Sequence, residues 1–137
     1  HAGSSTKAAR ADHVHQRETT AVALAGPADI TTHMEACSTV SGSGSLSLDL
    51  SAARQFVLTL TGNGTIAFAN IPATSARVVT WVVRVVSNGH TATWPAAVGW
   101  GTMLAPVLST GGLSDVLTFR TDDAGTHILG FIAGEGY

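Results

Sequence analysis

The chain has 137 residues, of which 45% are hydrophobic and only 12% are charged, and its formal net charge at pH 7 is −2. This length suits one ordinary domain with a short appendage. The net charge gives no sign of the basic surface that a nucleic-acid partner needs, so we expect no such partner. No apolar run approaches the roughly 18–20 residues of a membrane helix, so we expect no membrane insertion. The single Cys37 excludes an internal disulfide and a cysteine-based metal site.

The first 33 residues differ from the rest of the chain, because they carry neither a helical apolar stripe nor the alternation of a strand. A short apolar stretch at 19–25 is stopped by Gly26-Pro27. We therefore predict that residues 1–33 form an extended N-terminal arm or stalk. Residues 34–137 are predicted to form the head domain.

Two histidines in this arm, His13 and His15, lie two positions apart. In an extended chain such residues project from the same side, so one chain offers two imidazole nitrogens, too few to hold a metal ion firmly. Three chains around a threefold axis would offer six, an octahedral set that suits a divalent first-row metal ion. The alternative is a pair of solvated histidines.

From Met34 onward the pattern predicts one strand after another. Apolar residues alternate with others at 46–50 and 56–60, which is typical of strands that bury one face. Residues 41–45 are glycine- and serine-rich and are expected to form a loop, whereas 61–65 carry the Asn-Gly signal of a tight turn before a return strand.

The longest apolar run, residues 77–86, is almost entirely β-branched or aromatic and predicts the central strand. With a period of two, one face is wholly apolar and should point into the core. That face consists of Val79, Trp81, Val83 and Val85. The opposite face is more apolar than a water-facing strand surface usually is, so we expect an opposing sheet or a neighbouring subunit to cover it. It consists of Val78, Thr80, Val82, Arg84 and Val86.

The C-terminal half continues the same pattern. Asn88-Gly89 and residues 122–125 predict turns, residues 96–112 a long glycine-rich connection, and residues 128–133 the last strand. Short strands at regular spacing with glycine-containing turns are typical of antiparallel sandwiches. The sequence therefore predicts an all-β fold, an antiparallel and jelly-roll-like β-sandwich.

The acidic residues form no catalytic arrangement. Asp122 and Asp123 are adjacent in a predicted turn, where Asp is favoured because its side chain bonds the nearby backbone. The remaining carboxylates are scattered, with no couple of the kind that glycosidases use. No nucleophile motif of the Gly-x-Ser-x-Gly type lies between a strand and a helix. We therefore expect that the protein is not an enzyme.

Two tryptophans, Trp94 and Trp100, flank the glycine-rich connection. Aromatic side chains beside such a loop can form a platform on which a sugar stacks, so both are candidate ligand-binding residues. The alternative is that they seal the core or contact another subunit.

Two stretches resemble bacteriophage tail proteins. Residues 9–15, Ala-Arg-Ala-Asp-His-Val-His after a Gly-Ser-Ser-Thr run, look like a motif of tail-fibre and minor tail proteins. The region from Thr93-Trp94-Pro95 through 105–110 and 115–119 to 130–134 is similar to C-terminal domains of phage tail and fibre proteins. Neither motif is catalytic.

The resemblance implies a homotrimeric virion component whose N-terminal arm leads into a β-sandwich head. In such a trimer His13 and His15 would hold a metal ion on the threefold axis, as His-x-His pairs do in some phage fibres and spikes. Trimerisation would bury Val78, Val82 and Val86.

Two functions follow from this architecture. The first is an exterior appendage of the phage particle that attaches to the host surface, with other virion proteins and a host glycan or protein as partners. The alternative is a head fibre or capsid-decoration protein, anchored to the shell by its arm and without a receptor role.

Overall fold

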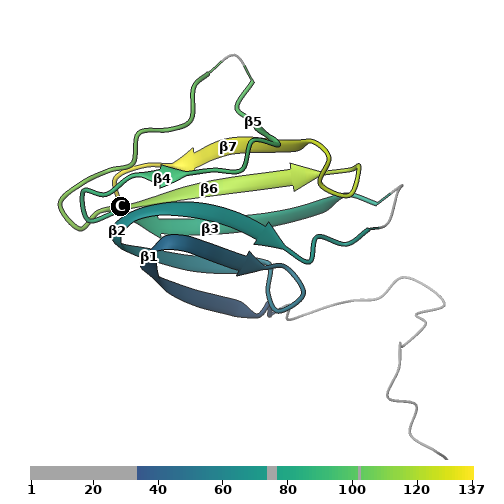
Figure 1. Cartoon of the computed structure of the whole chain (residues 1–137), viewed down its shortest axis with the longest axis horizontal. Helices are drawn as coiled ribbons and strands as arrows, with labels where there is room; N and C mark the ends of the chain where they lie inside the picture. The colour runs from purple at the N-terminus through teal and green to yellow at the C-terminus, as the bar shows by residue number, and fades with distance from the viewer. Residues whose placement is uncertain (1–33, 74–76, 102) are drawn as a thin grey trace, which may run out of the picture. The chain divides into compact units, whose positions relative to one another are not determined.

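The structure is a computed structural model, and it describes residues 34–73, 77–101 and 103–137. Over these residues the protein is all-β, as predicted, and contains no helix. Seven strands form a mixed sheet (Figure 1). They are β1 (Cys37–Asp49), β2 (Gln55–Ala69), β3 (Val79–Val86), β4 (Ala92–Thr93), β5 (Val98–Gly99), β6 (Ser114–Thr121) and β7 (Ile128–Gly134). The predicted arm, residues 1–33, lies outside the described residues.

The strand order is β1-β2-β3-β6-β7-β5, and β4 pairs with β2 off this path. β6 is antiparallel to both β3 and β7, but the pairs β1–β2, β2–β3, β2–β4 and β5–β7 are parallel. The prediction of an antiparallel sheet is therefore wrong for these four pairs. Alternation along a strand has a period of two whichever way its neighbour runs, so the pattern holds no information about direction. No helix able to cross a membrane is found in the described part of the chain.

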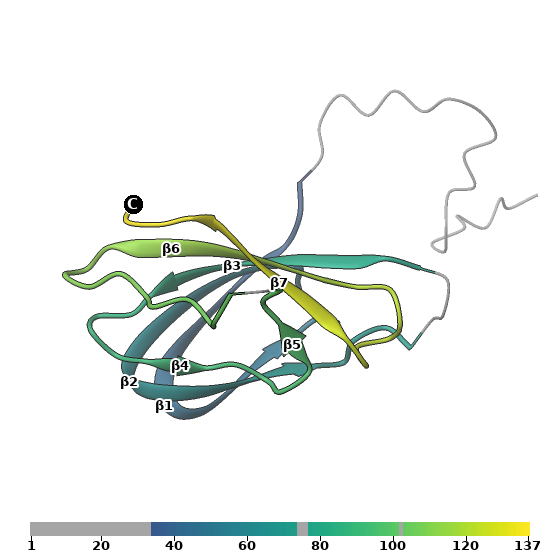
Figure 2. The ribbon, with the colours of Figure 1, turned by 90° about the horizontal axis from the view of Figure 1, so that it is seen from above.

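β1 and β2 each bend back on themselves. The bend explains how these two strands can pair in parallel although only a short connection separates them in the chain. A straight strand of 13 residues, the length of β1, spans about 40 Å, whereas a connection such as 50–54 reaches no more than about 20 Å. β1 must therefore bend for β2 to begin beside its start. Figures 1 and 2 show both strands turning at one side of the sheet.

Glycines mark the place of this bend. Gly42 pairs with Leu60 and Gly44 with Gly64, so the register shifts between them. Gly44 has a φ of 71°, which only glycine adopts readily, and a Cβ on Gly64 would lie 3.2 Å from the side chain of Leu46. Residues 41–45 therefore lie inside β1, and the predicted loop is wrong. The predicted turn at 61–65 likewise lies inside β2.

The predicted faces of the central strand are confirmed in β3. Val79, Trp81, Val83 and Val85 are buried, while Val78, Thr80 and Arg84 are exposed and Val82 and Val86 half-buried. The buried face of β3 packs into a core to which β1 and β2 contribute on both sides of their bends. Its fully buried apolar side chains are Leu48, Leu58, Leu60, Trp81, Val83, Val85, Leu117 and Phe119.

The predicted turns of the C-terminal half are present. Asn88 and Gly89 have φ values of 52° and 84° and lead β3 into β4, and Asn88 Nδ2 donates a hydrogen bond to the Leu60 carbonyl, 3.0 Å away. Ala124 and Gly125 have φ values of 60° and 88° and join β6 to β7. Asn and glycine tolerate such values well.

One buried carboxylate anchors the end of the long connection. Asp115 accepts hydrogen bonds from the Ser109 backbone N–H and hydroxyl, both at 2.6 Å, and from the Gly136 N–H at 3.0 Å. Burial opposes ionisation, but these hydrogen bonds outweigh it and lower the pKa of Asp115 below the usual 3.8. The ionised side chain therefore joins β6 to the connection and to the C-terminal residues.

Candidate functional site

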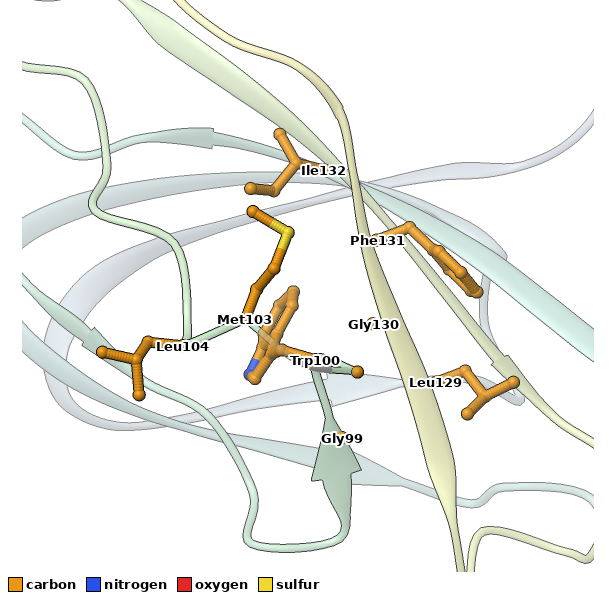
Figure 3. Close-up of a pocket in the computed structure, with 9 residues that line it drawn as sticks. Gly99, Trp100, Met103, Leu104, Leu129, Gly130, Phe131 and Ile132 are labelled. Carbon is orange, nitrogen blue, oxygen red and sulfur yellow. The ribbon is translucent and has the colours of Figure 1, made fainter.

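An apolar groove of about 470 Å³ lies beside β7 (Figure 3). The segment that leaves β5 forms one wall, and β7 forms the other. The lining residues are Gly99, Trp100, Gly101, Met103, Leu104, Leu129, Gly130, Phe131 and Ile132. None of them carries a charged or hydrogen-bonding side chain except the indole of Trp100.

The position of Trp100 depends on a glycine in β7. An added Cβ on Gly130 would lie 2.7 Å and 2.8 Å from two atoms of the Trp100 ring, so a residue with a side chain could not occupy this position without displacing the indole. The ring also packs edge-on against Phe119 and Trp94, with centroid distances of 5.7 Å and 6.2 Å. Trp100 is thus fixed from two sides and half-buried.

The side chains that line the groove lie on both sides of β7. Figure 3 shows Met103, Ile132 and Trp100 on one side of the strand, and Leu129 and Phe131 projecting from the other. Leu104 is 90% exposed at the rim. A surface of this kind suits an apolar partner, because it has almost no polar groups with which to orient the hydroxyls of a sugar.

The structure brings the two candidate ligand-binding residues together but gives them different surroundings. Trp94 is only 8% exposed and belongs to an aromatic cluster with Phe68, Phe119 and Trp100. Trp100 lines the groove. The ligand-binding role stays a prediction for both residues, and Trp100 offers the more accessible surface.

The candidate trimer-interface residues Val78, Val82 and Val86 lie on the outer face of the sheet. Val78 is 55% exposed, and the other two are half-buried. Their contact with another subunit stays a prediction. Leu129 and Phe131, also exposed, were not identified in the sequence as interface candidates. The alternation of 128–132 would have placed them on one face, opposite Ile128, Gly130 and Ile132.

The acidic turn between β6 and β7 has a structural role. Asp123 accepts hydrogen bonds from the backbone N–H of His127 at 2.9 Å and from the Thr121 hydroxyl at 3.0 Å, and its other oxygen is 2.6 Å from His127 Nδ1. The hydrogen bonds from His127, first from its backbone and then from its ring, lower the pKa of Asp123 to about 2. Asp123 therefore stays ionised and holds the turn in place.

No metal centre is found in the part of the chain that the structure describes, where no three His, Cys, Asp or Glu side chains form a group that could hold an ion. His13 and His15 lie outside this part. The metal site therefore stays a prediction.

No protein-family model, curated protein or solved structure matches this chain.

Proposed function

We propose that the protein is a structural component of a phage virion, a homotrimeric tail fibre or related exterior appendage that takes part in attachment to the host surface. In this proposal, residues 34–137 are a β-sandwich head of jelly-roll type. Residues 1–33 are the arm that leads into it and contacts other virion proteins.

The observation that carries the proposal is the composition of the outer face of β3. One face of this strand already supplies the core, so the other should be polar in a protein that works alone. Besides the exposed Thr80 and Arg84, it presents Val78, Val82 and Val86. Three valines on the outward face of a strand are more apolar side chains than a water-facing strand usually carries, and a subunit interface is the use that the resemblance to phage fibres favours.

Attachment to the host would use the groove beside Trp100. Its uncharged walls suit an apolar surface of a host protein better than they suit a glycan, although the exposed part of the indole could stack on one sugar ring. No catalytic role is proposed for this site.

The apolar lining of the groove favours a second candidate function. A head fibre or capsid-decoration protein needs an apolar groove only for neighbouring virion proteins, and the near absence of polar groups in the groove agrees with such a role. Binding of the purified protein to host cells separates the two functions, because only the appendage with a receptor role should bind.

The first experiment is the mass of the protein in solution by light scattering, with and without a strong chelator, together with elemental analysis. We expect three times the 14.0 kDa chain mass and one divalent first-row metal ion per three chains, bound by His13 and His15. A trimer without metal would retain the appendage and remove the metal site. A stable monomer would contradict the proposed function.

A further inference from the structure

The apolar groove runs along an edge of the sheet. Four consecutive residues of β7, 129–132, line it. Consecutive side chains of a strand point to opposite faces of the sheet, so a groove that all four residues line must follow the edge of the strand. Figure 3 shows this directly, with Ile132 on one side of β7 and Leu129 and Phe131 on the other. The backbone of β7 therefore borders the groove.

This edge of β7 is paired over only two residues. The last pair between β5 and β7 is Gly99 with Leu129, and the chain then turns at Gly101, which has a φ of 68°. No described strand pairs with residues 130–134 on the side of β7 that faces away from β6. The groove, whose lining includes Gly99, thus begins where β5 ends.

One hydrogen bond shows which backbone groups of β7 face the groove. The Ile128 N–H donates to the Ala97 carbonyl, 2.9 Å away, so it points away from β6. Backbone groups of alternate strand residues point to the same side, and those of Gly130 and Ile132 therefore point away from β6 as well. Because β5 ends at Gly99, the Gly130 carbonyl and the Ile132 N–H have no partner strand among the described residues.

These backbone groups distinguish between possible occupants of the groove. A sugar would meet no polar side chain except the indole of Trp100. A lipid acyl chain would cover the backbone groups without pairing them, which costs free energy. An extended peptide pairs with both groups and places its side chains against the apolar walls. β7 also carries no charged residue or proline, the residue types that commonly protect a strand edge from such pairing.

We propose that the groove binds an extended, uncharged peptide segment of a host surface protein, which joins the sheet as a strand beside β7. The Ile132 N–H donates to a carbonyl of the segment, and the Gly130 carbonyl accepts from one of its N–H groups. Side chains on one face of the segment contact Trp100 and Met103, and those on the other face lie beside Phe131. This inference rests on the proposed attachment to the host and names the chemical class of the partner.

The first test measures the affinity of the full-length protein for two blocked synthetic peptides. Both contain the segment Thr-Val-Ile-Val-Thr between pairs of lysines that keep them soluble, and in the second every residue of the segment is N-methylated. Methylation makes the peptide more apolar but removes its hydrogen-bond donors. We expect binding of the first peptide and an affinity for the second that is weaker by about tenfold or more. A purely apolar contact would instead keep or strengthen the binding of the second.

The second test removes the donor on the protein. Ile132→Pro deletes the N–H that faces the groove and no hydrogen bond to β6, and proline is tolerated at such edge positions. The matched control is Val107→Pro, because Val107 is apolar and 92% exposed but lies outside the groove. Ile132→Pro should lose binding to the peptide and to host cells with a wild-type near-ultraviolet circular dichroism spectrum. The control should keep both.

Amide hydrogen exchange of the wild type tests the same contact without a substitution. Addition of the unmethylated peptide should slow exchange of the Ile132 amide by about tenfold or more, because the amide gains an acceptor. The Phe131 amide, which faces β6, should not change. This measurement decides the matter if Ile132→Pro does not fold.

The possible failures are distinguishable. Equal affinity for the two peptides, or no binding of the unmethylated peptide at millimolar concentration, would overturn this inference alone, provided that the wild type binds host cells. A wild type that binds no host cells would overturn the proposed attachment and, with it, the host protein as the partner.

Discussion

Replacing Gly130 by alanine should disrupt the groove by displacing Trp100. The new Cβ would lie 2.7 Å and 2.8 Å from the Trp100 ring and 2.9 Å from Val98 Cγ1, distances that packed atoms do not tolerate. The indole cannot give way without losing its contact with Phe119, whose ring centroid is 5.7 Å away. Overpacking of this kind costs about 1–3 kcal/mol, and each kcal/mol lowers Tm by roughly 4–8 °C in a domain of this size.

The measurement is urea unfolding at fixed protein concentration, followed by circular dichroism, together with the tryptophan emission spectrum of the native state. We expect a lower free energy of unfolding and an emission shifted to longer wavelength, because the displaced indole meets water. Gly99→Ala is the matched control in the adjacent β5, where the nearest atom to an added Cβ is 3.9 Å away. Its stability should be unchanged or higher by about 0.4–1 kcal/mol. Equal stability and equal emission for the two variants would refute the packing argument.

Two further predictions concern the core and its buried carboxylate. Asp115→Ala should lower the free energy of unfolding by about 1–3 kcal/mol, because the N–H groups of Ser109 and Gly136 lose their acceptor. The folded-state pKa of Asp115 lies below 3.8, so the stability that this carboxylate contributes is complete above pH 3.8 and is lost as the pH falls through the folded pKa. Urea unfolding at several pH values should show this loss of stability in the wild type and not in Asp115→Ala. The same pH dependence in both proteins would disprove the stabilising role of Asp115. Trp94→Phe should be much milder than Trp94→Ala, which costs about 3–5 kcal/mol, because Trp94 Nε1 has no hydrogen-bond partner among the described residues. Thermal unfolding of the two Trp94 variants tests this, and equal losses would contradict it.

The period-two pattern identified only part of the outer face of the sheet. Val78, Val82 and Val86 were found because alternation within one strand shows which residues share a face. Phe131 lies on the same outer face as Val82 because Val82 pairs with Thr118 of β6 and Thr118 pairs with Phe131 of β7. Such a register depends on residues far apart in the chain, so no local pattern contains it.

The groove could be predicted even less completely. Trp100 was a candidate from its type and from the glycines around it, but its wall in β7 lies about 30 residues further along the chain. Gly130 resembled an ordinary strand glycine in the sequence. Its role as the contact surface of Trp100 depends on the pairing of β5 with β7. This pairing places the Trp100 indole where a side chain on residue 130 would otherwise lie.

The sequence by itself determined the all-β class, the buried face of β3 and the turns at Asn88-Gly89 and 122–125. These features depend on side-chain stiffness, on alternation along one strand and on the backbone freedom of glycine and asparagine, all of which are local. Only the tertiary structure decided that β1 and β2 bend back and pair in parallel, and that Phe131 and Val82 share one surface. Strand direction and neighbours depend on how distant segments bury their apolar faces together, because either direction satisfies the same alternation.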